Sequence, residues 1–192
     1  MIFPDSKLPK YAWLAASLLF SICGTPPFFA AGLRSSSPKF EDAGTFILLL
    51  AGRQIGTEKF QIRPSGGGIK ACAEIQFKVS QDGKGLEFKT YPDLILNSQL
   101  QPVAYTWNQQ GAKSSQIQIN FRESPATVRY HTIHGQQDDR EFNLARDVVI
   151  LDDNVIDQYE LLAWRYSMTA GGKQTFAAFI PQEALPGTIE VS

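Results

Sequence analysis

Residues 152–172 read Asp-Asp-Asn-Val-Ile-Asp-Gln-Tyr-Glu-Leu-Leu-Ala-Trp-Arg-Tyr-Ser-Met-Thr-Ala-Gly-Gly and form the one segment of the chain with a clear helical pattern. At about 100° per residue its apolar side chains fall into two stripes on opposite sides of a helix. The first stripe is Val155, Ile156, Tyr159, Leu162, Ala163 and Tyr166. The second stripe is Leu161, Trp164 and Met168. A helix that lies on a sheet and faces water needs only one stripe, so we expect both sides of this helix to be covered.

The ends of the helix are predicted from capping residues. Asp153 or Asn154 has a side-chain oxygen that can accept a free N–H group of the first turn. Gly171 and Gly172 suit the left-handed conformation that ends many helices. The expected helix therefore covers about residues 154–169.

Two interpretations explain the second stripe. In the first, a curved sheet or a loop packs over it. In the second, it lines a pocket for an apolar ligand or lipid, or a surface for a partner. The candidate ligand-binding residues are Leu161, Trp164 and Met168 of the helix, with Tyr105 and Trp107 from the strands.

The rest of the chain from residue 44 onward is predicted to be strands. Residues 69–79 alternate apolar and polar side chains, as expected for a strand with one wet face. Residues 45–51 are continuously apolar, which is typical of a strand buried on both faces. Residues 86–91 form another strand, which Pro92 is expected to stop. The fold class expected is mainly β: a curved antiparallel sheet, either a half-barrel or a barrel, wrapped around one late α-helix.

The N-terminus resembles an export signal. Lys7 and Lys10 precede the apolar residues 11–23, and the small residues 30–32 fit cleavage after Gly32. Alternatively, residues 11–33 carry no charge and are long enough to anchor the chain in a bilayer about 30 Å thick. We therefore expect an exported protein, periplasmic or extracellular, that is either released or anchored by this segment.

The domain organisation follows from that signal. Residues 1–32 are expected to be the signal peptide or anchor, residues 33–43 a polar linker, and residues 44–192 a single β-rich domain. The net charge is −1 and the basic residues are scattered, which argues against a nucleic-acid partner. After cleavage Cys72 would be the only cysteine, so no internal disulfide is expected.

The order of these features resembles a known group of proteins. A glycine-flanked hairpin at Gly52 and Gly56, long alternating strands, the segment 102–107 and a late helix together look like uncharacterised exported bacterial β-proteins. The pattern is more loosely similar to the half-barrel lipoprotein carriers of the LolA/LolB type. That resemblance implies a curved sheet that holds apolar cargo, although in this chain the main helix lies nearer the C-terminus.

Catalytic and metal sites find little support in the sequence. His131 and His134 lie three apart on a predicted strand, so their side chains point to opposite faces. Asp152, Asp153 and Asp157 could form paired carboxylates, but helix capping explains them without catalysis. We expect no cofactor and no metal. The leading hypothesis is a non-enzymatic binding domain, followed by an envelope interaction module without a pocket and by a hydrolase-type or metal enzyme that uses the two histidines.

Overall fold

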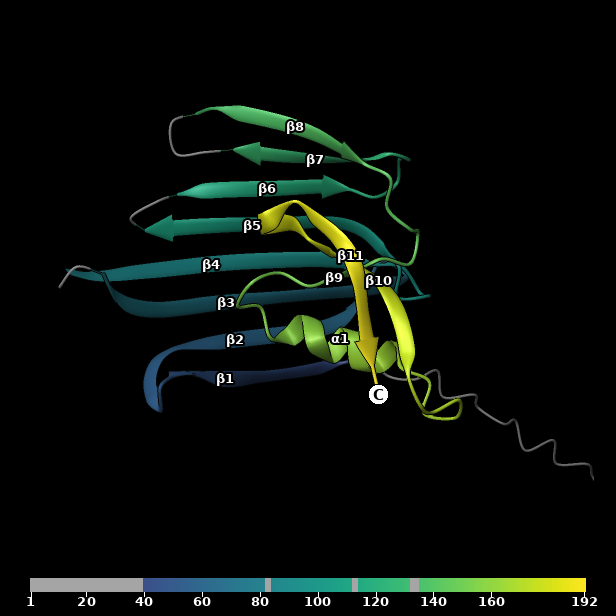
Figure 1. Cartoon of the computed structure of the whole chain (residues 1–192), viewed down its shortest axis with the longest axis horizontal. Helices are drawn as coiled ribbons and strands as arrows, with labels where there is room; N and C mark the ends of the chain where they lie inside the picture. The colour runs from purple at the N-terminus through teal and green to yellow at the C-terminus, as the bar shows by residue number, and fades with distance from the viewer. Residues whose placement is uncertain (1–39, 82–83, 112–113, 132–134) are drawn as a thin grey trace, which may run out of the picture. The chain divides into compact units, whose positions relative to one another are not determined.

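The computed structural model describes residues 40–81, 84–111, 114–131 and 135–192. Within them the fold is mainly β, with an eight-stranded sheet, a three-stranded sheet and the helix α1 (Figure 1). None of the helices in this part of the chain has the length and apolar character needed to cross a bilayer. The strands of the large sheet are β1 (Asp42–Leu50), β2 (Arg53–Ser65), β3 (Gly68–Gln81), β4 (Lys84–Leu96), β5 (Pro102–Gly111), β6 (Ser115–Asn120), β7 (Ala126–His131) and β8 (Gln137–Phe142).

The small sheet and the helices come last in the chain. Their bounds are β9 (Val149–Ile150), α1 (Asp157–Arg165), β10 (Gln174–Ile180), the 3₁₀ helix η1 (Pro181–Glu183) and β11 (Leu185–Val191). Strand β10 lies between β11 and β9, antiparallel to the first and parallel to the second. This sheet and α1 both lie against one face of the large sheet (Figure 1).

The large sheet follows the simplest possible topology. Its strands pair in sequence order, each antiparallel to its neighbour, from β1 at one edge to β8 at the other. The two edge strands do not pair with each other, so the sheet is curved but not closed. The predicted curved antiparallel sheet with one late helix is confirmed, in its open form.

The main core lies between the concave face of the large sheet and the elements that cover it. The alternation predicted for β3 holds, since Ile69, Ala71 and Ile75 are buried there. Tyr105 on β5 and Val128 on β7 continue the same core across the sheet. Burial of one face across many strands provides most of the hydrophobic stabilisation of such a fold.

The two apolar stripes of the helix now have a structural explanation. Leu161 packs into the main core against the large sheet. Leu162 packs into a second cluster with Val149, Leu151 and Ala178 of the small sheet and its flank. The helix therefore contacts both sheets, but Tyr159 and Ala163 of the first stripe are exposed, so that side of α1 is only partly covered.

The helix is shorter than the expected span of 154–169. Asn154 has a φ of 61°, which is incompatible with a helix, and α1 begins only at Asp157. At the other end Tyr166 is already extended. Met168 of the second stripe lies beyond the helix and is 84% exposed.

The prediction that residues 45–51 form a strand buried on both faces is wrong. The run is apolar, but β1 is an edge strand, and Ile47, Leu49 and Leu50 are about 60% exposed (60%, 62% and 60%). A register shift between Leu48 and Leu49 marks the predicted bulge near the turn.

The prediction that Pro92 ends a strand is also wrong. Strand β4 continues through Pro92 to Leu96, and Pro92 lies opposite Trp107 of β5. The pairing with β3 is interrupted between Thr90 and Asp93 and resumes in the same register, because the long flanking ladders hold the strand in place.

Candidate functional site

The start of α1 is capped by a residue far away in the sequence. The N–H groups of Ile156 and Asp157 donate to the carboxylate of Glu58 on β2, each at 2.8 Å. Glu58 is completely buried, and no side chain of the loop before the helix makes this cap. The predicted capping by Asp153 or Asn154 is therefore wrong, because the large sheet supplies the acceptor.

Glu58 and Asp157 form a buried pair of carboxyl groups. Burial, followed by the charge of Glu58, raises the pKa of Asp157 to about 7. Burial also raises the pKa of Glu58, while its hydrogen bonds from Ile156 and Asp157 oppose that rise. Near neutral pH the pair is most stable with one proton. Glu58 is then the ionised group, because its carboxylate accepts the two backbone N–H groups of the helix, and the proton is on Asp157.

A second buried acid lies close to the first pair. Asp152, just after β9, accepts hydrogen bonds from the Tyr105 hydroxyl at 2.6 Å and from the Gln182 backbone N–H at 3.0 Å. Burial raises the pKa of Asp152 to about 6. Gln158 of α1 completes the network, since it accepts from the Asp152 N–H and donates to the Tyr105 oxygen. These hydrogen bonds connect β5 of the large sheet, α1, and the segments next to β9 and β10 of the small sheet.

Two buried side-chain atoms in the described part of the chain lack a hydrogen-bond partner. They are Trp107 Nε1 and Asp157 Oδ1. Nearly all buried polar atoms in proteins are satisfied, so these two atoms are exceptions, and Asp157 Oδ1 belongs to the buried carboxyl pair.

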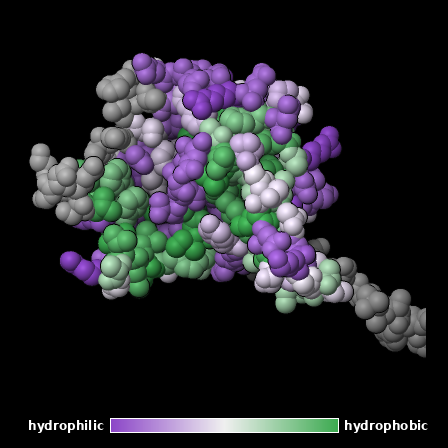
Figure 2. All heavy atoms as spheres, in the orientation of Figure 1, coloured by the Kyte–Doolittle hydropathy of each residue, from purple (hydrophilic) through white to green (hydrophobic). Residues whose placement is uncertain are grey.

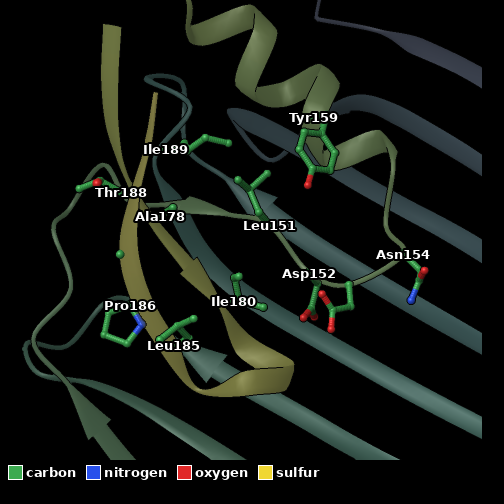
Figure 3. A pocket seen from close by; sticks show the side chains of 12 residues that line it. Leu151, Asp152, Asn154, Tyr159, Ala178, Ile180, Leu185, Pro186, Thr188 and Ile189 are labelled. Carbon is green, nitrogen blue, oxygen red and sulfur yellow. The ribbon is translucent and has the colours of Figure 1, made fainter. Parts of the chain in front are cut away.

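An open pocket of about 360 Å³ lies beside this network (Figure 3). Aliphatic side chains of the small sheet form one side of it, including Leu151 before α1 and Ile180 and Leu185 on either side of η1. The Tyr159 ring of α1 lies beside Leu151, and Asp152 and Asn154 lie on the loop that follows Leu151. The volume falls in the range typical of small-molecule sites, roughly 300–1,000 Å³.

The chemistry of the pocket is that of an apolar trough with an acidic end. Its apolar wall also includes Ala178 and Ile189, whereas Asp153 and Asn154 of the loop line the polar side. Asp152 is already occupied by two donors, so the exposed Asp153 carboxylate is the freer acceptor. An apolar molecule whose polar end donates hydrogen bonds or carries positive charge fits this arrangement.

The five residues predicted to bind a ligand are dispersed in the structure. Tyr105, Trp107 and Leu161 belong to the main core. Trp164 is partly buried against that core, and the centroid of its ring lies 5.2 Å from the centroid of the Phe40 ring. Met168 is exposed beyond the helix. Of these, only Tyr105 reaches the pocket region, through its hydrogen bond to Asp152.

The space between α1 and the large sheet is nearly filled. The cavity that Leu161 lines with Leu94 and Val148 has room of only about 10 Å³, close to the minimum for one water molecule. This cavity between α1 and the large sheet is therefore too small for a ligand, whereas the pocket on the side of the small sheet is not.

The histidine hypothesis gains no support from the geometry. His131 is at the end of β7, and His134 lies outside the described residues. The nearby acids are used in ion pairs, Asp139 with Arg129 and Asp138 with Arg140. In the described ranges no three His, Cys, Asp or Glu side chains are grouped so as to hold a metal ion.

Sequence reasoning could have found part of this site. Glu58, Phe60 and Ile62 alternate along β2, so their side chains point to the same, buried face of the strand. A charged residue among apolar ones on this face is unusual. That anomaly is visible in the sequence, although its partner is not. The pocket residues Ile180, Leu185 and Ile189 give no such signal, since they look like ordinary strand residues.

Comparisons with known proteins leave the chain without an assigned family. No protein-family model, no curated protein and no solved structure matches it. The site must therefore be interpreted from its own geometry.

Proposed function

We propose that this protein is an exported, non-enzymatic binding domain for an apolar small molecule or lipid. The observation that carries the proposal is the pocket of about 360 Å³ between α1 and the small sheet, with an aliphatic wall and carboxyl groups at one end. The ligand would lie between α1 and the small sheet, not between α1 and the large sheet. The bound molecule would direct its polar, hydrogen-bond-donating end towards Asp153.

The proposed export rests on the sequence alone. Lys7 and Lys10 followed by the apolar residues 11–23 support a signal peptide, and residues 11–33 support membrane association if cleavage does not occur. Mass measurement of the mature protein from its host would distinguish a start after Gly32 from an intact N-terminus.

The test of ligand binding uses a neutral apolar fluorophore, N-phenyl-1-naphthylamine. Leu185 is 51% exposed in the pocket wall, so Leu185→Asp places a charge there without disturbing the core. We expect this change to weaken binding of the fluorophore by at least about tenfold, because a carboxylate must be desolvated by the ligand. The measurement is a fluorescence titration, accompanied by native mass spectrometry of the protein as isolated.

The matched control is Leu49→Asp on β1, a leucine of similar exposure that lies outside this pocket. It should leave the affinity unchanged. Equal loss in both variants, or none in Leu185→Asp, would reject the pocket as the binding site.

The alternative function, an envelope interaction module, is favoured by a different observation. Strand β1 exposes large apolar side chains at an open sheet edge. Among the described residues nothing covers these side chains, so the edge offers a surface for a protein partner that is separate from the pocket.

A further inference from the structure

Within the described ranges, β1 carries the largest group of exposed large apolar side chains. Ile47, Leu49 and Leu50 are each 60% or more exposed, and apolar residues gather at the lower left of Figure 2, where β1 ends and β2 begins. No charged residue and no proline occurs from Ala43 to Leu50. An edge strand with these properties is a template for pairing with another strand.

The opposite edge of the same sheet is protected. Four of its central residues are charged and exposed, namely Asp138, Asp139, Arg140 and Glu141 of β8. Charged side chains on an edge strand prevent pairing with other chains. A head-to-tail contact of β1 with β8 of another copy would desolvate these charges against leucines, so it is disfavoured.

Strand β1 is instead complementary to itself. Its first half has the small residues Ala43, Gly44 and Thr45, and its second half is Ile47 to Leu50. Antiparallel pairing about a two-fold axis at Phe46 would place Ala43 opposite Leu49, and Thr45 opposite Ile47, of the partner. Large side chains then meet small ones on the face away from the core.

The charges at the two ends of the strand agree with this pairing. Asp42 lies at the start of β1, and Arg53 lies just beyond its end, across the turn from Leu50. In this register Asp42 of one copy lies opposite Leu50 of the other, and Arg53 lies on the adjacent strand β2 of that other copy. Asp42 also interacts with Glu160 of α1 in its own chain. The two opposite charges are therefore near each other, on either side of Leu50, at both ends of the contact. A two-fold axis at Phe46 makes this contact a closed dimer.

We propose that β1 pairs antiparallel with β1 of a second copy of this chain, which joins the two eight-stranded sheets into one continuous sheet. The contact is separate from the ligand pocket, and either can exist without the other.

The test is sedimentation velocity of the full chain over a range of concentrations. The unaltered protein is expected to form dimers. Leu49→Lys, which adds the charge that protected edges carry, should raise the dimer dissociation constant by at least about tenfold. Leu185→Lys, at a leucine that is also more than half exposed but lies off this edge, should leave the dimer unchanged.

A second measurement tests the register. In a background with Cys23 and Cys72 replaced by Ser, a Thr45→Cys chain is mixed with an Ile47→Cys chain under mild oxidation by copper phenanthroline. The mixture should give a disulfide-linked dimer, and each chain alone should give little. Association through residues 11–33 would be insensitive to the Leu49 change. A monomer at every concentration, or a dimer that persists in Leu49→Lys, would overturn the proposal.

Discussion

Two regions of this molecule invert the usual distribution of polar and apolar groups. At the start of α1, Glu58 and Asp157 are buried inside the core. On β1, Leu49 and Leu50 are exposed. Both arrangements are unfavourable by themselves, since charges prefer water and leucines prefer the interior.

The difference lies in where each unfavourable group finds its partner. The buried Glu58 is satisfied within the chain, because it accepts two backbone N–H groups that the helix leaves free. The exposed leucines have no such partner in the described part of the chain. A buried polar group thus explains the fold, whereas an exposed apolar strand points to a partner outside it.

The largest effect should come from breaking the buried cap. Glu58→Ala leaves the N–H groups of Ile156 and Asp157 without an acceptor and opens a cavity. We expect a loss of about 3 kcal/mol in the free energy of unfolding, measured by urea denaturation.

Glu58→Gln is the control, because its amide oxygen can still accept one of the two N–H groups. Its loss should be about 1 kcal/mol. If both variants unfold like the unaltered protein, Glu58 does not hold the helix in place.

The second effect is the pH dependence of stability. In the folded state the pKa of Asp152 is about 6 and that of Asp157 about 7, above the ordinary value of about 4 that applies on unfolding. The folded state therefore binds these protons more tightly. The stabilisation from these two groups is fully present below about pH 4 and is lost as pH rises through about 6 and 7 towards 8.

The measurement is thermal unfolding at several pH values. Asp157→Asn, which is neutral at every pH, should flatten the profile between about pH 6 and pH 8. A profile that rises through this window would contradict the assignment of raised pKa values to these acids.

The smallest effect on stability should come from the exposed strand. Leu49→Lys is expected to change the free energy of unfolding by no more than about 0.5 kcal/mol at protein concentrations where the chain is monomeric. The measurement is urea denaturation in dilute solution. A loss comparable to that of Glu58→Ala would mean that Leu49 is packed within the monomer, and the contrast between the two regions would disappear.

The sequence by itself determined that the chain is mostly strands with one late helix. The alternation of residues 69–79 and the two stripes of residues 152–172 carry that information locally, since side-chain direction repeats with the secondary-structure period. The length of the helix was less well predicted, because Asn154 and Tyr166 depart from helical geometry.

Only the tertiary structure decided which strand lies at the edge, which residue caps the helix and where the pocket is. An apolar run such as residues 45–51 has the same pattern in the centre of a sheet and at its margin, so its exposure depends on the strands beside it. Glu58 and Asp157 are 99 residues apart and meet because the sheet curves under the helix. Contacts of this kind depend on long-range packing, which no local period in the sequence encodes.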